Sequence, residues 1–208
     1  ADTLRLYEMF LGPIEQSKPW DTKGISGVHN FLRKCWRLYC DSDGNSILSE
    51  DIPSKEYMKT LHKAIKRIRE DLNRYSLNTC VSTYMIAVNE FTEQKCHNKE
   101  VLEQFIILLA PYAPHFCEEL WEKIGNGVGT LYESNYPEFN KDYLVEDTYE
   151  YPVSFNGKMR FKVELPLSLK QDELKKELEK MDQTIKWLDG KEPKKVIIVP
   201  GKIVNFVV

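Results

Sequence analysis

The chain has 208 residues, of which 42% are hydrophobic and 29% charged, which is sufficient for one or two soluble domains with a buried core. It has no run of about 18 apolar residues, which argues against a membrane-spanning helix. Its net charge of −3 is unevenly distributed, because residues 1–150 have 17 basic and 24 acidic side chains whereas residues 151–208 have 12 and 8. The sequence therefore predicts a basic C-terminal module on an acidic body.

The cysteines and the first residues indicate the compartment. Five cysteines are present, an odd number without a CxxC pair, which argues against a disulfide framework and fits a reducing, cytoplasmic location. The sequence opens at Ala1 without a basic segment followed by an apolar one, so no secretory signal peptide is predicted. Because an initiator Met is also lacking, we expect the chain to be part of a longer protein.

Residues 1–125 have the 3.6-residue hydrophobic period of amphipathic helices. Ser26 is the expected N-cap of the second helix. Pro111 and Pro114 should kink or interrupt the fifth, because proline removes a backbone donor. Amphipathic helices of this kind bury their apolar faces in a helical bundle. The helices are predicted at residues 2–11, 26–39, from 55 onward, 77–95 and 98–124.

The polar loop at residues 41–53 has a partial calcium-binding pattern. Asp41, Asp43 and Asn45 match the first, third and fifth positions of an EF-hand loop. The required glycine is replaced by Ser46 and the bidentate glutamate by Ile52. A solvated turn is therefore the favoured interpretation, and no metal site is predicted.

Residues 125–150 are acidic and aperiodic, which predicts a wrapping loop and linker. From Tyr151 the hydrophobic period changes to two, and Asn156-Gly157 is a strong signal for a two-residue hairpin turn. A helix is expected from Ser168 to Leu188, followed by a second hairpin across Pro200-Gly201. The pattern predicts a small β-β-α-β-β domain of about 58 residues, near the lower size limit for independent folding.

No catalytic constellation is recognisable. The glycine-rich stretch that starts at Gly125 lacks the lysine of a phosphate-binding loop. His115 follows Pro114 on an amphipathic helix, so a hydrogen-bonded, partly buried histidine is favoured over a general base. A zinc site at Cys96-His97 has little support, because structural zinc needs four grouped ligands. We therefore expect no catalytic residue and no cofactor in this chain.

Basic side chains gather on several predicted faces, where they fit contacts with phosphate groups. Each lysine taken singly is better explained as part of a solvated surface. An exposed aromatic ring could stack on an unpaired base; Trp20 is the candidate, whereas Trp36, Trp121 and Trp187 have the pattern of core residues. The predicted RNA-contacting residues are Arg33, Lys34, Arg37, Lys63, Arg67, Asn156, Lys158, Arg160, Lys194, Lys195 and Lys202.

Several strings, in this order and spacing, resemble bacterial-type leucyl-tRNA synthetases, a family of class I aminoacyl-tRNA synthetases. The segment at residues 1–20 resembles the region just after the KMSKS loop, and residues 27–38 resemble the first anticodon-domain helix. Residues 109–121 (LAPYAPHFCEELW) match a pattern that the leucine, isoleucine and valine enzymes share. Residues 153–160 and 194–205 resemble the small C-terminal domain of the leucine enzymes.

The resemblance covers essentially the whole chain and implies two tRNA-binding domains. The first is a helical anticodon-binding domain at residues 1–148, which would pack along the tRNA stem. The second is a small α+β domain at residues 149–208, which would reach the corner where the D and T loops meet. In the family's pattern, Arg33, Lys34 and Arg37 lie on the basic helix.

The resemblance also implies the activity of a longer parent enzyme, which joins leucine to its tRNA with ATP. The catalytic motifs and the editing domain are absent from these residues, so ATP and magnesium are expected in an upstream catalytic domain. The implied partners are leucine tRNA and that domain, with no membrane or DNA. Two alternatives stay open: an RNA-binding module of another class I synthetase, such as the valine or isoleucine enzyme, or a protein-interaction domain.

Overall fold

The computed structural model describes residues 1–208 except 22, 146–147, 168, 189, 191–192 and 200–201. It divides into two compact units, Ala1–Leu144 and Val145–Val208, which are described separately. The sequence pattern placed the boundary four residues later, between residues 148 and 149. The expected fold class, a helical bundle followed by a small α+β domain, is confirmed by the element order.

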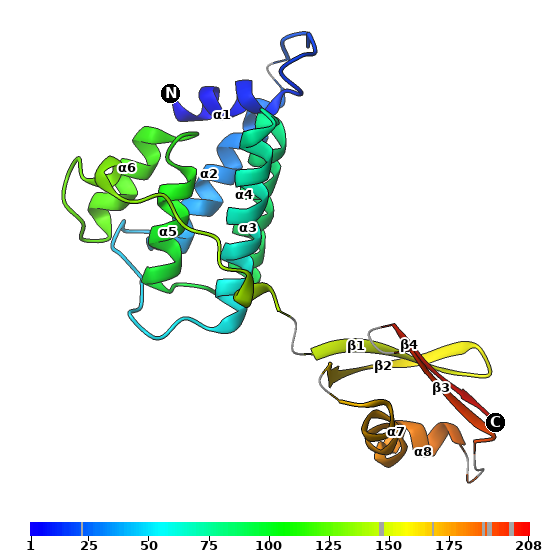
Figure 1. Ribbon diagram of the computed structural model, residues 1–208. Helices are drawn as coiled ribbons and strands as arrows, with labels where there is room; N and C mark the ends of the chain where they lie inside the picture. The colour runs from blue at the N-terminus through cyan, green and yellow to red at the C-terminus, as the bar shows by residue number, and fades with distance from the viewer. Residues whose placement is uncertain (22, 146–147, 168, 189, 191–192, 200–201) are drawn as a thin grey trace. The chain divides into compact units, whose positions relative to one another are not determined.

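The described residues of the first unit form a bundle of six α-helices (Figure 1). Helix α4 packs against α1, α2 and α3, and α5 packs against α3 and α6. The boundaries match the hydrophobic period closely, because each helix buries the apolar face that the period defines. The helices are α1 (Asp2–Phe10), α2 (Ile25–Tyr39), α3 (Lys55–Asn73), α4 (Leu77–Glu93), α5 (Lys99–Leu109) and α6 (Pro114–Lys123).

Short polar side chains begin two of these helices. The side chain of Ser54 accepts a hydrogen bond from Tyr57 N at 3.2 Å, and that of Asn98 accepts one from Val101 N at 3.1 Å. Both satisfy a backbone donor that the first helical turn leaves free. The prediction for Ser26 was wrong: the N-cap of α2 is Gly24, and the Ser26 hydroxyl donates instead to the Lys23 carbonyl.

The predicted interruption at the two prolines is confirmed. Helix α5 ends at Leu109, and Pro114 is the first residue of α6, where its missing N–H leaves no hydrogen bond unmade. Ala113, the N-cap of α6, has no side chain that can cap the helix. The Asp2 carboxylate takes this role from a distant part of the sequence, accepting from Phe116 N at 2.5 Å and lying 2.9 Å from His115 Nδ1. This contact ties the start of the chain to α6.

The core of the first unit is one continuous cluster of side chains from all six helices. Two large tyrosines in it have hydrogen-bonded hydroxyls, since Tyr39 Oη donates to the Leu102 carbonyl at 3.0 Å and Tyr84 Oη to the Leu108 carbonyl at 2.7 Å. These bonds offset the cost of burying the two polar groups. All five cysteines are also buried, and burial raises the pKa of each thiol, that of Cys96 to about 11.

Two loops of the first unit were predicted as irregular. At residues 41–53 the Asp41 carboxylate accepts hydrogen bonds from Asp43 N and Asn45 N, and these bonds lower its pKa. Between residues 125 and 145 the helical elements of the acidic segment are two short 3-10 turns, η1 (Leu131–Glu133) and η2 (Lys141–Leu144), whereas its last residues, from Thr148 on, belong to a strand. It is nevertheless anchored, because η2 packs on α3.

His62 of α3 forms the anchor for η2. Its ring is buried and stacks on Tyr143, with centroids 4.5 Å apart and an interplanar angle of 8°. Its Nδ1 accepts a hydrogen bond from Asn140 N at 3.2 Å, which requires an unprotonated Nδ1. This hydrogen bond therefore belongs to the neutral imidazole.

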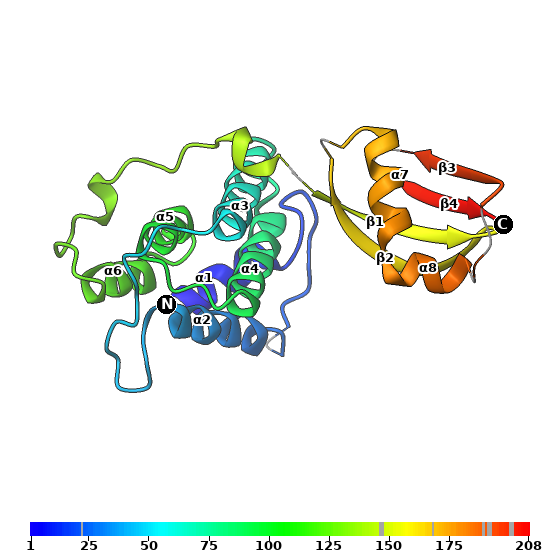
Figure 2. The same cartoon turned by 90° about the horizontal axis from the view of Figure 1, so that it is seen from below.

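In the part of the second unit that the structure describes, a four-stranded sheet has two helices on one face (Figure 2). The strand order is β2-β1-β4-β3, in which β1 and β4 are parallel and the other pairs antiparallel. Leu174 and Leu178 of α7 and the inward residues of β1 and β4 form a separate core. The strands are β1 (Thr148–Phe155), β2 (Lys158–Pro166), β3 (Lys195–Val199) and β4 (Ile203–Val207).

The single helix expected at residues 168–188 is in fact two, α7 (Gln171–Lys180) and α8 (Asp182–Leu188). They break at Met181, whose backbone is extended (ψ 133°) and whose side chain packs against the core. An unbroken apolar period in the sequence could not show this break. Ser168 and the Pro200-Gly201 turn lie outside the described residues.

The Asn156-Gly157 turn is confirmed, with positive φ angles of 49° and 80°, as a type I′ turn requires. Asn156 Oδ1 accepts from Val208 N and Asn205 Oδ1 accepts from Gly157 N, both at 3.0 Å. These two amides fasten the first hairpin to the end of β4. Asn156 is thus a structural residue in this fold, whatever else it contacts.

The first prediction concerns His62 and pH. Burial lowers the pKa of His62 below its ordinary value of 6.5, so the unfolded chain binds a proton that the folded chain excludes. The stabilisation by neutral His62 is therefore present above pH 6.5 and is lost as the pH falls from 6.5 through the lowered folded-state pKa. His62→Phe, which keeps a ring against Tyr143, should flatten the decrease in unfolding free energy between pH 7 and 5 measured with urea. Identical pH profiles for the two proteins would contradict this role.

The second prediction concerns the Asp2 contact. Asp2→Ala removes the acceptor at the start of α6 and should lower the unfolding free energy of the helical unit by about 1–2 kcal/mol. Asp43→Ala, at an exposed aspartate of the 41–53 loop, is the matched control and should have an effect within about 0.5 kcal/mol. Chemical denaturation followed by circular dichroism measures both. An equal effect of the two changes would show that the Asp2 contact does not stabilise α6.

Candidate nucleic-acid interface

The outer face of α2 carries three of the predicted contact residues. Helix α2 buries Val28, Phe31, Leu32 and Cys35, so the side chains between these positions point to solvent. Arg33 and Arg37 are exposed and lie one helical turn apart. They have no ion pair with any residue that the structure describes. Their charge is therefore available to a ligand.

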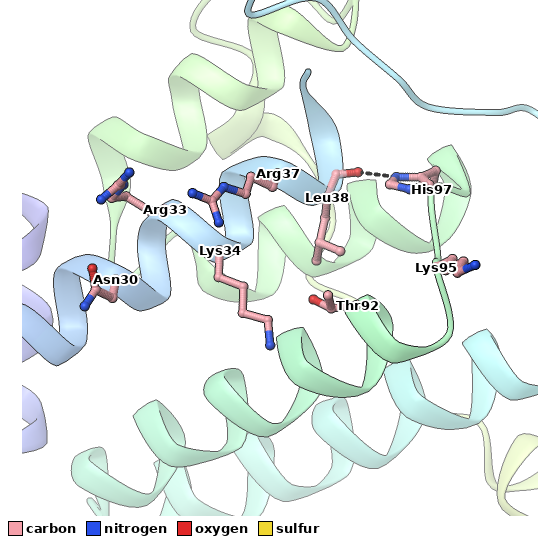
Figure 3. Close-up of a pocket in the computed structure, with 8 residues that line it drawn as sticks. All are labelled: Asn30, Arg33, Lys34, Arg37, Leu38, Thr92, Lys95 and His97. Carbon is pink, nitrogen blue, oxygen red and sulfur yellow. Dashed lines mark hydrogen bonds between the residues drawn. The ribbon is translucent and has the colours of Figure 1, made fainter. Parts of the chain in front are cut away.

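A hollow of about 520 Å³ lies between this face of α2 and the end of α4 (Figure 3). We call it the α2 hollow. Four of its lining residues are basic and none is acidic, although the first 150 residues have an excess of acidic side chains. Such a hollow favours a polyanion. The lining residues are Asn30, Arg33, Lys34, Arg37, Leu38, Thr92, Lys95 and His97.

Hydrogen bonds hold two of these side chains in place. Lys34 Nζ donates to Asn89 Oδ1 of α4 at 2.6 Å, which spans the gap between the two helices. His97 Nδ1 lies 2.9 Å from the Leu38 carbonyl, near the end of α2. A carbonyl can only accept, so Nδ1 carries the hydrogen and Nε2 is the free ring nitrogen. The α2 hollow thus has a partly fixed wall.

A second hollow of about 710 Å³ adjoins the first and shares Arg33, Arg37 and His97 with it. Trp36 also lines this second hollow. The Trp36 ring is partly buried against the core, lies 6.0 Å from the Phe116 ring and has Lys123 Nζ 5.8 Å from its centroid. Its prediction as a core residue is therefore only partly right.

Lys63 and Arg67 do not join the α2 hollow. They line a different groove of about 430 Å³ between α3 and α4, which also contains the Glu90 carboxylate. Arg67 Nε lies 3.0 Å from Oδ2 of the buried Asp71, so this guanidinium already has an anionic partner. The sequence pattern grouped these residues with the α2 cations, but the structure separates the two sets.

In the second unit, Lys158, Arg160 and Lys162 are exposed on β2. Two of them have partners: Lys162 Nζ lies 2.7 Å from Glu150 Oε2, which raises the pKa of Lys162, and the Arg160 guanidinium lies 4.2 Å from the Trp187 ring centroid. Trp187 is 43% exposed, so its prediction as a core residue was wrong; Trp121 is buried as predicted. Lys158 has no partner among the described residues.

The remaining predicted residues of the second unit are also on its surface. Lys194, Lys195 and Lys202 are exposed, and none has an ion pair within the described part of the chain. They flank the ends of β3 and β4.

Trp20, Lys95 and His97 are three further surface residues of the first unit, of which only Trp20 was predicted to contact RNA. Trp20 is 54% exposed and contacts the Tyr7 ring edge-on at 5.4 Å. Lys95 and His97 were not predicted as contact residues; Lys95 was expected to end the fourth helix, but α4 ends at Glu93 and both residues lie on the α4–α5 connection.

Two further properties bear on the chemistry of the described residues. Among them there is no group of three or more His, Cys, Asp or Glu side chains placed to hold a metal ion. None of the described helices is long and apolar enough to cross a membrane. His115 is hydrogen-bonded as predicted, with its Nδ1 2.9 Å from Asp2 Oδ1, but its prediction as a partly buried residue was wrong, because its side chain is 78% exposed.

Comparison with solved structures supports the fold. The crystal structure of the ternary complex of Agrobacterium radiobacter K84 agnB2 LeuRS-tRNA-LeuAMS superposes with a TM-score of 0.66 over 99% of this chain and 28% of that chain. The sequence identity is 21%, so this likeness concerns the fold alone.

Sequence comparisons are more specific. The leucine–tRNA ligases of Christiangramia forsetii and Flavobacterium johnsoniae are 56% and 55% identical over 207 of the 208 residues of this chain. That of Bacteroides thetaiotaomicron is 49% identical. The chain spans about a fifth of the length of these curated relatives. Residues 54–178, more than half of the chain, match the family described as the anticodon-binding domain of tRNA ligase, and the chain therefore belongs to that family.

Proposed function

We propose that this chain is the tRNA-docking region of a leucine–tRNA ligase. The observation that carries the proposal is similarity at 48–56% identity across both units to proteins that are all named leucine–tRNA ligase. A shared anticodon-binding domain alone would leave the amino acid open. The match of the small second unit within the same alignments favours the leucine enzyme over the valine and isoleucine enzymes.

In this role the two units supply binding energy and orientation to the tRNA. Contacts between basic side chains and phosphates give affinity and position but little sequence information. A tRNA held at a distance from the reacting groups still accelerates the reaction, because its acceptor end no longer has to find the active site by free diffusion. The exposed cations of α2 and of the β3–β4 ends are suited to such contacts.

Leucine activation belongs to other parts of the proposed parent enzyme. ATP and magnesium would bind there, and the parent would act in the cytoplasm. The present chain then needs no catalytic residue of its own. Its partners would be leucine tRNA and the catalytic domain of the same polypeptide.

The third prediction tests this function directly. The 208-residue chain should bind leucine tRNA with an affinity that falls steeply with salt, since each phosphate contact releases counterions. Fluorescence anisotropy between about 50 and 200 mM salt measures the slope. A second tRNA of mismatched identity shows whether this region discriminates or only docks. The absence of binding at low salt would favour a protein-interaction domain instead.

The fourth prediction concerns Lys158 of the second unit. Lys158→Glu should weaken tRNA binding by about 3- to 10-fold, because it replaces a free cation with an anion. Arg160 is a poorer probe, since its substitution also removes the contact with Trp187. Lys176→Glu, at an exposed lysine on α7, makes the same change in net charge and should have little effect. Equal weakening by both variants would indicate only a general charge effect.

A further inference from the structure

We propose that the α2 hollow is the phosphate-binding site of the helical unit, and that Lys95 and His97 belong to it while Lys63 and Arg67 do not. The inference rests on the proposed function and assigns its contacts to particular residues. The α2 hollow (Figure 3) and the α3–α4 groove flank the same helix, α4, and they differ in charge.

The two surfaces differ in the anions that they contain. The groove between α3 and α4 holds Glu90, whose Oε2 accepts a hydrogen bond from Thr60 Oγ1 at 2.8 Å, and its Arg67 is paired with Asp71. A phosphate entering there would meet a carboxylate and an already neutralised guanidinium. The α2 hollow has no acidic lining residue, and its two arginines have no ion pair in the described part of the chain. Electrostatics therefore favours the α2 hollow.

The backbone places Lys95 at this hollow. Lys95 has a φ of +55° and follows the last turn of α4. Its N–H bonds to the Thr92 carbonyl at 3.1 Å, and Cys96 N bonds to the Phe91 carbonyl at 2.9 Å, which is the hydrogen-bond pattern of a Schellman motif. Glycine is the usual residue at such a position. Here the position carries an exposed lysine, whose base is held by two backbone bonds and the buried Cys96.

His97 is placed by a different contact. Its Nδ1–H points to the Leu38 carbonyl at 2.9 Å, so its ring is fixed at the end of α2. The free Nε2 of a neutral imidazole accepts a hydrogen bond, and a ribose 2′-hydroxyl can donate one. Together, Arg33, Arg37 and Lys95 suit the phosphates and His97 suits the adjoining ribose of one RNA strand.

Matched lysine variants of the full 208-residue chain test the assignment. Lys95→Gln and Lys63→Gln each remove one charge and keep a long side chain. With leucine tRNA as the probe, Lys95→Gln should weaken binding by about 3- to 10-fold and reduce the slope of log K against log salt by about one. Lys63→Gln should change affinity by less than about 2-fold and leave the slope unchanged. His97→Asn retains a donor near Leu38, removes Nε2, and should also weaken binding severalfold.

A second probe separates failure of this inference from failure of the proposed function. Inorganic tripolyphosphate, added to isotopically labelled protein, should shift the NMR signals of Lys95 and His97 and not those of Lys63 and Arg67. If tRNA binds but Lys95→Gln matches the wild type, or Lys63→Gln is the weaker binder, the site assignment is overturned and the function stands. If tRNA does not bind, the proposed function fails, and the tripolyphosphate titration alone decides whether the hollow is a phosphate site.

Discussion

The packing of α4 against both α2 and α3 is the constraint on which the rest of the helical unit depends. Cys80, Val81, Tyr84, Val88 and Phe91 are completely buried along α4, which fixes its rotation. The opposite side of α4 must then face solvent, with α2 along one edge and α3 along the other. The α2 hollow and the α3–α4 groove are consequences of this arrangement, because each is the space left at one edge of the same helix.

The arginines of the helical unit differ in whether a carboxylate pairs with their guanidinium group. Arg33 and Arg37 have no ion pair among the described residues, although Asp41 lines the second hollow beside them. Arg67, in contrast, lies one turn from Asp71, a buried aspartate on its own helix, and pairs with it. A guanidinium that is already paired offers less to an incoming phosphate, since the ligand must replace an existing interaction. The helical unit can therefore bind a polyanion at one place although its overall composition is acidic.

In the second unit, the parallel pairing of β1 with β4 brings the first hairpin and the end of the chain together. Asn156 and Asn205 then hold these segments through bonds to Val208 and Gly157. A unit of this small size has a limited hydrophobic core, so these side-chain hydrogen bonds add to its stability. Lys158 comes directly after the Asn156-Gly157 turn. The two hydrogen bonds restrict the backbone at this turn, so the charge of Lys158 is held near a defined position on the surface.

The sequence by itself determined the helical bundle, the small α+β module, the break at the prolines and the turn at Asn156-Gly157, because hydrophobic period and backbone restrictions are local. It also determined that Arg33, Lys34 and Arg37 share one exposed face. Only the tertiary structure decided that Lys95 and His97 join that face, that Arg67 is neutralised and that Trp187 is exposed beneath Arg160. The break at Met181 and the capping of α6 by Asp2 were likewise hidden. The Arg67–Asp71 pair has an i,i+4 spacing that the sequence contains, but only the structure shows Asp71 buried beside the guanidinium. The other contacts join residues from different elements or depend on a backbone angle, and no periodicity along the chain records them.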